Sequence, residues 1–384
     1  MGQIRRVLVN LESRATYGYS RNVMRAMRES PNLECRTLVT GMHLMPELGD
    51  SLALIRGDGF PVSETVPLAP HDEGRGAWPM AMGTAMAGFA EAVERQDPDI
   101  ILISGDRAES LTLCVTAAYM GIPIAHVQAG DRSGHIDDAA RFAIGKLAHI
   151  HLASCDDSAD RLRQMGEQDF RIFNVGAPQL DDIVDRSFAA SSVSVEGTKF
   201  GLDKPYILLV QHPVMAEREG AAEQMRACIG ACLATGIRVV WIYPNSDLGY
   251  TNIIQVIDEQ RGRGNLTIAR NLERDDFLTL LANAAALVGN SSSGILEAPS
   301  FRVPVINIGT RQRGRPQAAN ILNCGYSESE ISAALNEAIT DTAFRQACAG
   351  AVNPYGDGRS GKRICEILES IALDHALLDK QTTY

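Results

Sequence analysis

Short apolar runs alternate with stretches of helical spacing along this chain, and this alternation limits its fold more than any other feature. The runs carry Val, Ile and Leu without a strict polar alternation, which is typical of strands buried on both faces of a sheet. The stretches between them, such as 223–236, have the spacing of amphipathic helices. Repeated strand–helix units indicate parallel sheets with helices on both faces. The expected strands are 5–11, 35–41, 99–106, 122–130, 150–154 and 171–177, then 206–213, 238–245, 266–270, 286–290 and 303–309.

The chain is long enough for two domains. Its 384 residues correspond to two or three domains of about 150 residues, and two is the simplest number. The Ser- and Gly-rich segment 188–205 lacks a helical stripe, and we interpret it as a linker. We therefore predict an α/β protein with two Rossmann-like, doubly wound parallel-sheet domains, at 1–187 and 206–365. A C-terminal helix and a frayed tail are expected over 366–384.

Composition excludes several classes of protein. Hydrophobic residues make up 45% and charged residues 22% of the chain, as in ordinary globular proteins. A formal net charge of −11 gives no reason for binding nucleic acid or an anionic membrane. No signal peptide or membrane span is expected. The eight cysteines form no CxxC pair, so we expect reduced thiols in the cytoplasm and no metal site, although Cys228 and Cys232 are one helical turn apart.

The candidate site residues follow the expected strands. Ligands of doubly wound sheets bind beyond the carboxyl ends of the strands, and we expect the two sets of ends to face one interdomain cleft. The positions that this rule selects are 105–107, 128–131, His212, Asn245 and 289–293.

The run GNSSSGILEAPS (289–300) follows a strand and begins a helical turn. Small residues let the backbone approach an anion, and free amides at a helix start point toward it. Ser291 and Ser292 add hydroxyl groups, and Glu297 could accept hydrogen bonds from a ribose. The alternative is a Ser-rich cap with no ligand. The chain has no GxGxxG after its first strand, no GxxxxGK[ST] and no GxSxG, so NAD-type, P-loop and acyl-transfer functions lack support.

Charged residues gather at two places in the first half. Asp106 and Arg107 end a strand, where a carboxylate beside a guanidinium stays ionised; a structural ion pair is the alternative. A helix is expected to begin near 133–137, with Asp137 and Asp138 in its first turn, where the helix dipole favours carboxylates. Asp131 and Arg141 lie in the same 20-residue window, which suggests more than capping.

His212 is a single histidine at the end of an expected strand. It is either structural or a ligand of a diphosphate, with which it could also exchange protons.

Taken together, these segments resemble the hydrolysing UDP-N-acetylglucosamine 2-epimerases of bacterial sialic-acid-type sugar synthesis, and the epimerase half of the corresponding animal bifunctional enzyme. The resemblance runs from the first strand to about residue 325. It is carried by VTGMHL (39–44), GDR (105–107), HIDDAARFAI (135–144), NVGAP (174–178), QHPV (211–214) and GNSSSGILEAPSFRVPVINIGTRQRGR (289–315). It implies the GT-B architecture, which agrees with the predicted two domains.

The resemblance also implies a reaction. The nucleoside diphosphate of a UDP- or GDP-linked 2-acetamido sugar such as UDP-GlcNAc is eliminated, and water adds to the resulting 2-acetamidoglucal. The product is the free 2-epimer, a ManNAc-type sugar for sialic or nonulosonic acid synthesis, and no cofactor or metal is needed. The implied catalytic residues are Asp106, Asp137, Asp131 and His212; the nucleotide- and phosphate-binding residues are Arg14, Ser291, Ser292, Glu297, Arg311 and Asn245; and the sugar-binding residues are Arg107, Asp138 and His43.

Three positions depart from the family pattern. Thr16 stands where relatives have an acid, Gln128 where they have Glu or His, and Asp131 where they have Glu. Gln128 cannot accept a proton at pH 7, so it is not the base. Because Asp106, Asp137 and His212 remain, we expect a shifted sugar preference rather than weakened chemistry.

Alternatives stay open. One is a non-hydrolysing epimerase, against which HIDD rather than a PEE-type motif argues. The others are a GT-B glycosyltransferase and a nucleotide-sugar-binding sensor without turnover. The resemblance implies a homodimer or homotetramer, and it leaves open the base, the substituents at sugar carbons 4 and 6, and the pathway.

Overall fold

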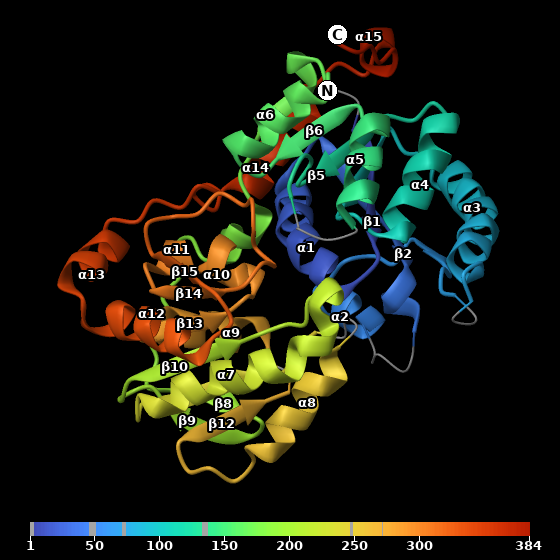
Figure 1. Ribbon diagram of the computed structural model, residues 1–384. Helices are drawn as coiled ribbons and strands as arrows, with labels where there is room; N and C mark the ends of the chain where they lie inside the picture. The colour runs from blue at the N-terminus through green and yellow to red at the C-terminus, as the bar shows by residue number, and fades with distance from the viewer. Residues whose placement is uncertain (1–3, 46–50, 71–73, 133–136, 246–248, 271) are drawn as a thin grey trace. The chain divides into compact units, whose positions relative to one another are not determined.

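The protein is described by a computed structural model that covers residues 4–45, 51–70, 74–132, 137–245, 249–270 and 272–384. Its internal contacts divide it into two compact units (Figure 1). Unit 1 contains residues 4–132, 137–184 and Tyr355–Tyr384, and unit 2 contains Asp185–Pro354.

Unit 1 is built on a parallel sheet of seven strands. The strands are β1 (Arg5–Leu11), β2 (Leu33–Thr40), β3 (Glu64–Val66), β4 (Ile100–Ser104), β5 (Ile124–Val127), β6 (Ile150–Ala153) and β7 (Ile172–Asn174). Their order in the sheet is β3-β2-β1-β4-β5-β6-β7. Every residue of β4, β5 and β6 is buried, as expected for strands covered on both faces.

Helices cover both faces of this sheet. They are α1 (Arg14–Glu29), α2 (Ser51–Gly57), α3 (Ala77–Gln96), α4 (Ala108–Tyr119), α5 (Asp137–Leu147), α6 (Asp156–Gln164), α14 (Ser360–Ser370) and α15 (His375–Leu378), with 3-10 turns at Gly41–Leu44, Asp169–Arg171 and Pro178–Asp182. Val7 and Val9 face a core shared with α1 and α14, and Leu8 faces a second core with α3 and α4. Successive side chains of β1 therefore point to opposite faces of the sheet and pack into two different cores.

Unit 2 repeats this plan with a parallel sheet of six strands. They are β10 (Tyr206–Val210), β11 (Arg238–Ile242), β12 (Leu266–Ala269), β13 (Ala286–Gly289), β14 (Val305–Ile308) and β15 (Ile321–Cys324), in the order β12-β11-β10-β13-β14-β15. The helices are α7 (Ala221–Ala234), α8 (Tyr250–Glu259), α9 (Arg274–Asn283), α10 (Ser292–Leu296), α11 (Ala298–Phe301), α12 (Glu328–Thr340) and α13 (Thr342–Ala349), with a 3-10 turn at Met215–Gly220. Trp241 on β11 is fully buried in the core with α7, α8 and α12.

The segment predicted as a linker is an antiparallel hairpin instead. β8 (Ser192–Val195) pairs with β9 (Thr198–Gly201). Val193, Val195 and Phe200 are buried in the second core of unit 2, against residues of α9. A strand that buries only alternate residues among Ser and Gly gives a weak sequence signal, which explains the wrong interpretation.

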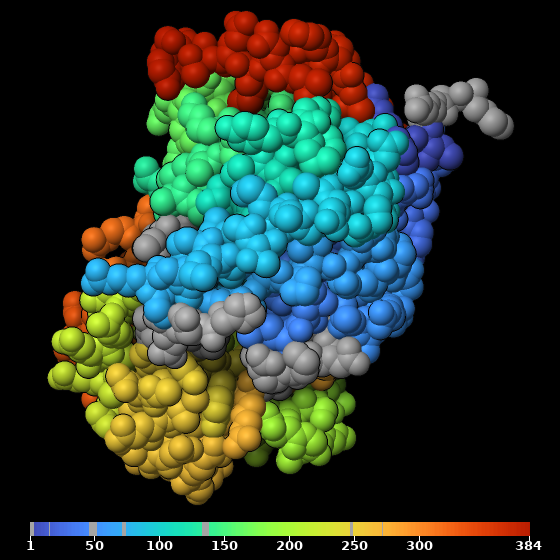
Figure 2. Space-filling model, turned by 90° about the vertical axis from the view of Figure 1, so that its right-hand side faces the viewer, coloured from blue at the N-terminus to red at the C-terminus, as the bar shows by residue number. Residues whose placement is uncertain are grey.

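The C-terminal boundary also differs from the prediction. The chain returns to unit 1 at Tyr355, so α14 does not belong with residues 206–354. Ile364 and Leu368 of α14 are buried against α1 and β1. The residues after α14 are packed on unit 1 rather than frayed, and Figure 2 shows them (red) against its green and cyan segments. A C-terminal helix was expected over 366–384, whereas α14 spans Ser360–Ser370. Helical spacing does not indicate which core a helix joins.

None of the described helices is long and apolar enough to span a membrane.

Candidate active site

The turn after β4 holds Asp106 in place. Gly105 has φ +98°, a conformation that favours glycine. Its carbonyl oxygen lies 3.0 Å from His126 Nε2 on β5. Burial lowers the pKa of His126 to about 3, so the imidazole is neutral and Nε2 donates to Gly105. Asp106 itself forms an ion pair with Arg141 of α5, which is 7% exposed.

The structure changes the expected partner of Asp106. The sequence suggested the adjacent Arg107, but the ion pair joins Asp106 to Arg141, 35 residues away. Arg107 pairs with Glu109, with 3.3 Å between Arg107 Nε and Glu109 Oε2. Arg141 also lies 4.0 Å from Asp138, measured between Nε and Oδ1. Two predicted site residues, Asp106 and Asp138, are thus brought together around Arg141.

The other acids of this region have different surroundings. Asp131 is buried, and its Oδ1 accepts hydrogen bonds from Ser154 (2.5 Å) and Ser158 (2.7 Å). These contacts orient Asp131 toward the beginning of α6. Asp137 begins α5, as the sequence predicts, but its side chain lies outside the described part of the structure.

Glu12 is a site-region residue that sequence reasoning missed. It follows β1, is fully buried, and accepts a 2.6 Å hydrogen bond from Ser110. Burial and the nearby charge of Glu109 raise its pKa to about 8, so Glu12 is protonated at neutral pH. Glu12 could have been found from the sequence, because it is a charged residue directly after a strand expected to be buried.

Two further predicted residues of unit 1 lie near the strand ends. His43 is buried in the 3-10 turn after β2, with its ring 6.2 Å from that of Tyr17. Burial lowers the pKa of His43 to about 4, so it is neutral. Arg14 begins α1 and is exposed, next to the Ser13 cap.

In unit 2, His212 is held in one orientation after β10. Asn290 accepts from the His212 amide (2.7 Å) and donates to its carbonyl (2.8 Å). The amide of Asn245 donates to His212 Nδ1 over 3.0 Å. Burial, with a smaller effect of Arg311, lowers the pKa of His212 to about 3. The ring is therefore neutral with its proton on Nε2, which suits a hydrogen-bond donor to an anion.

The Ser-rich turn after β13 begins at Asn290, the residue that holds His212. Ser291 is the N-cap of α10 and accepts from the Ser293 amide. Arg311 and Gln312 both donate to the carbonyl of Asn290, at 3.3 and 2.8 Å. His212, Asn245 and Ser291, which the strand-end rule selects, are thus brought together in unit 2 with Arg311, which the resemblance implied.

Glu297 differs from the expectation in one respect. It is 5% exposed, and its Oε1 forms an ion pair with Arg274 of α9. From the sequence we expected Glu297 to bind a ribose. The ion pair with Arg274, which precedes β13 in the chain, was not predicted.

Among the residues that the structure describes, no three His, Cys, Asp or Glu side chains gather where they could hold a metal ion. Cys228 and Cys232 are buried in the core of unit 2.

Comparisons with known proteins identify the family. The model of the UDP-N-acetylglucosamine 2-epimerase family matches residues 25–369. A UDP-N,N'-diacetylbacillosamine 2-epimerase (hydrolyzing) from Legionella pneumophila is 34% identical over 381 residues, 99% of this chain and 100% of that protein. A GDP/UDP-N,N'-diacetylbacillosamine 2-epimerase (hydrolyzing) from Campylobacter jejuni is 28% identical and covers 83% of this chain and 84% of its own.

A solved structure agrees with the fold. The UDP-GlcNAc 2-epimerase of Neisseria meningitidis bound to UDP-GlcNAc superposes with a TM-score of 0.77 at 17% identity, covering 94% of this chain and 99% of its own. The predicted class, two Rossmann-like domains of the GT-B type, is confirmed by this likeness together with the two parallel sheets. The whole-length identity and the family match show that the chain belongs to the UDP-N-acetylglucosamine 2-epimerase family.

Proposed function

We propose that this protein is a hydrolysing nucleotide-sugar 2-epimerase acting on a UDP- or GDP-linked 2-acetamido sugar. The observation that carries the proposal is the identity with two relatives named as hydrolysing enzymes, one of them over its whole length. Both names specify N,N'-diacetylbacillosamine, which makes UDP-N,N'-diacetylbacillosamine the first substrate to test, beside UDP-GlcNAc.

The reaction has two stages. In the first, the bond between sugar carbon 1 and the diphosphate oxygen breaks while a base removes the carbon-2 proton. The electron pair of the C–H bond forms the double bond of a 2-acetamidoglucal. In the second, water supplies a hydroxyl group to carbon 1, and a proton is added to carbon 2 from the opposite face. The products are the nucleoside diphosphate and the free 2-epimer.

Unit 1 supplies the proton-transfer groups in this proposal. Asp106, paired with Arg141, is the group that accepts the carbon-2 proton in this proposal. Asp137, in the first turn of α5, and Asp131 are the remaining acids for protonation and for delivery of water. Arg107, Asp138 and His43 are the sugar-binding residues; the neutral His43 can donate or accept a hydrogen bond.

Unit 2 supplies the groups for the leaving diphosphate. His212, with Nδ1 occupied by the Asn245 amide, offers Nε2–H to a phosphate oxygen. Arg311, Ser291 and Ser292 add positive charge and hydroxyl donors. Arg14 is the remaining nucleotide-binding residue of the proposal. Oriented donors of this kind contribute about 2.7–4 kcal/mol each to stabilising a departing anion. Glu297, oriented by Arg274, would accept from the ribose hydroxyl groups.

The test is release of nucleoside diphosphate, measured with a coupled assay on UDP-N,N'-diacetylbacillosamine, UDP-GlcNAc and their GDP counterparts. Wild type should release diphosphate from at least one substrate. Asp106→Asn should lower kcat by about 10²–10⁴-fold, because general-base catalysis contributes that much, while the Kd for UDP changes little.

Asp97→Asn is the matched control. Asp97 is exposed at the C-cap of α3 and pairs with Arg6, so its kcat should equal that of wild type. No diphosphate release from any substrate, or full activity of Asp106→Asn, would overturn the proposal.

We also propose a cytoplasmic location and a homodimeric or homotetrameric state. All eight cysteines are free thiols, which fits a reducing compartment.

A further inference from the structure

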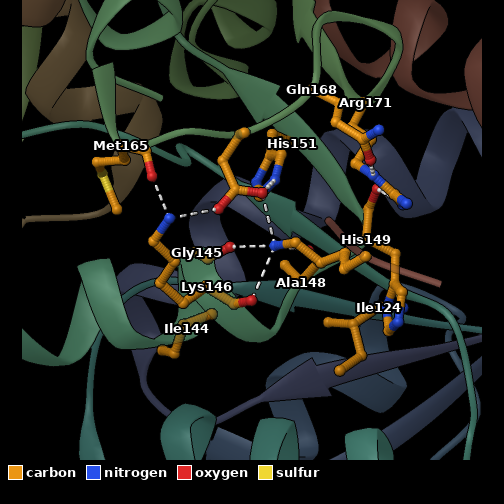
Figure 3. Close-up of polar contacts among 12 residues, drawn as sticks. Ile124, Ile144, Gly145, Lys146, Ala148, His149, His151, Met165, Gln168 and Arg171 are labelled. Atoms are coloured by element: carbon orange, nitrogen blue, oxygen red, sulfur yellow. Dashed lines mark hydrogen bonds and ion pairs between the residues drawn. The ribbon is translucent and has the colours of Figure 1, made fainter. Parts of the chain in front are cut away.

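A buried ionic cluster joins the last residues of the chain to the rest of unit 1. Glu167 is 3% exposed and contacts three nitrogen groups. Figure 3 labels two of the residues that carry them, Lys146 and His151. Lys380 Nζ lies 2.6 Å and Lys146 Nζ 3.2 Å from its carboxylate oxygens, and His151 Nε2 lies 2.9 Å away. Burial opposes ionisation of Glu167, but the hydrogen bonds from His151 and Lys380 prevail and lower its pKa to about 2. The cluster therefore favours the carboxylate form of Glu167, which pairs with Lys380.

Lys380 also closes the end of α5. Its Nζ donates to the carbonyls of Gly145, Lys146 and Ala148 at 3.0, 2.8 and 2.7 Å. The last carbonyls of a helix have no partner within the helix, and a cation there also interacts favourably with the helix dipole. Lys380 thus provides hydrogen-bond donors for the last carbonyl groups of α5, which have no donor within the helix.

A second residue fixes the backbone that carries Lys380. The Arg171 guanidinium donates to the carbonyls of Ala376 (2.8 Å), Leu377 and Asp379 (3.2 Å). Leu377 is buried in the core of unit 1. The position of Lys380 is therefore set by Arg171 and by the core, independently of its own contacts.

The other end of α5 reaches the candidate active site. Arg141 on α5 forms the ion pair with Asp106, and its guanidinium also donates to the carbonyl of Gln128 over 3.4 Å. Arg141, Gly145 and Lys146 lie on the same short helix, and Ala148 directly follows its last residue. A shift of α5 along or about its axis would therefore move Arg141 relative to Asp106, and displacements of about 1 Å are costly in an active site.

We propose that Lys380 is a positioning residue for catalysis: by capping α5 it holds the Arg141–Asp106 pair in the geometry that proton transfer requires. This inference rests on the proposed function, since Asp106 is its catalytic base. Lys380 acts through α5 and not on the substrate.

The test replaces Lys380 by methionine, which keeps the length of the side chain and removes its donors. Lys380→Met should lower kcat about tenfold with KM and the Kd for UDP changed less than twofold. Lys380→Arg, which keeps a cation with several donors, should recover part of the loss. Lys362→Met, on the exposed face of α14 where Lys362 pairs only loosely with Glu366, is the matched control and should have wild-type kcat.

A second variant separates positioning from folding. Lys380→Met leaves Glu167 with fewer partners, which destabilises a buried charge, whereas Lys380→Met combined with Glu167→Gln removes that charge and still lacks the cap. The double variant should keep the low kcat. A kcat within twofold of wild type in either folded variant would overturn the inference.

Hydrogen–deuterium exchange provides a readout that does not depend on activity. The amides of residues 141–148 should exchange at least tenfold faster in Lys380→Met than in wild type, while those of α4 do not change. Unchanged exchange in α5 would contradict the inference. Absence of turnover in wild type would instead refute the proposed function, and the exchange measurement would still decide whether Lys380 holds α5.

Discussion

At the scale of single residues, Glu12 is a buried carboxyl group in the same region as Asp106. Asp106 is paired with a guanidinium. Burial, followed by the charge of Glu109, opposes the ionisation of Glu12 and outweighs the opposite effects of Ser110 and Arg107. The side chain of Glu12 lies close beneath the Asp106 turn, because a Cβ at Gly105 would be 2.9 Å from Glu12 Oε1. A neutral Glu12 avoids a third negative charge beside Asp106 and Glu109.

Glu12 makes stability fall with rising pH. Its pKa is about 8 in the folded protein, against a reference value of 4.5. Between these values the unfolded chain loses the proton while the folded protein keeps it, so unfolding becomes easier by up to about 1.4 kcal/mol per pH unit. Below pH 4.5 and above pH 8 this contribution is constant.

Glu12→Gln should therefore remove that pH dependence. Glutamine is neutral and can still accept from Ser110, so the variant should match wild type at pH 5 and be more stable by a few kcal/mol at pH 8. Urea unfolding at the two pH values measures this, with the exposed Glu34→Gln as control. An equal pH dependence in wild type and Glu12→Gln would show that Glu12 is ionised in the folded protein.

Only those features of the site that depend on the local sequence could be predicted. Asp106 and His212 follow buried strands, and the strand-end rule finds them. The Asp106–Arg141 pair and the raised pKa of Glu12 arise from contacts between segments far apart in the chain, so no spacing in the sequence indicates them.

At the scale of elements, the turn from β13 to α10 depends on Gly289. Its φ is +127°, and a Cβ there would lie 2.1 Å from the carbonyl oxygen of Val210 on β10. That approach lets Asn290 hold His212 by two hydrogen bonds. The glycine therefore serves both the packing of the sheet and the orientation of His212.

Gly289→Ala should disrupt unit 2. Overlap with backbone atoms cannot be relieved by a side-chain movement, so we expect a loss of more than about 3 kcal/mol in the free energy of unfolding and loss of UDP binding. Urea unfolding and calorimetric titration measure the two effects. Gly264→Ala, where no atom lies within 4 Å of the new Cβ, should change stability by less than about 0.5 kcal/mol. Equal stability of the two variants would contradict the account of this turn.

The elements themselves were largely predictable. Each expected apolar run contains a strand, because strands buried on both faces are apolar throughout. The sequence missed β3 and β15, which are edge strands, and the hairpin of β8 and β9. Edge strands and hairpins bury less of their surface, so their composition differs less from that of loops.

At the scale of the whole molecule, the two units differ in continuity. Among the residues that the structure describes, unit 2 takes the segment Asp185–Pro354, and it has its own cores. Unit 1 requires Tyr355–Tyr384, because Ile364, Leu368 and Leu377 complete the core with α1. This division follows from packing, which a sequence pattern does not show.

The continuity predicts how fragments behave. A fragment of residues 185–354 should fold cooperatively and bind UDP without turnover. A fragment of residues 1–184 should be less stable by several kcal/mol, because burying each of the missing Ile and Leu side chains contributes about 1.5–3 kcal/mol, and a peptide of residues 355–384 should restore stability. Circular dichroism with thermal melting tests both fragments, and a 1–184 fragment that is unaffected by the peptide would contradict this assignment.

The central claim is that the chain removes the diphosphate and inverts carbon 2 with release of the free sugar. A proton NMR time course in deuterated water, with UDP-N,N'-diacetylbacillosamine and UDP-GlcNAc as substrates, tests it most directly. The account predicts free UDP and a free 2-epimer carrying deuterium at carbon 2. A 2-epimer still attached to UDP, or a nucleotide sugar that stays intact throughout, would contradict it.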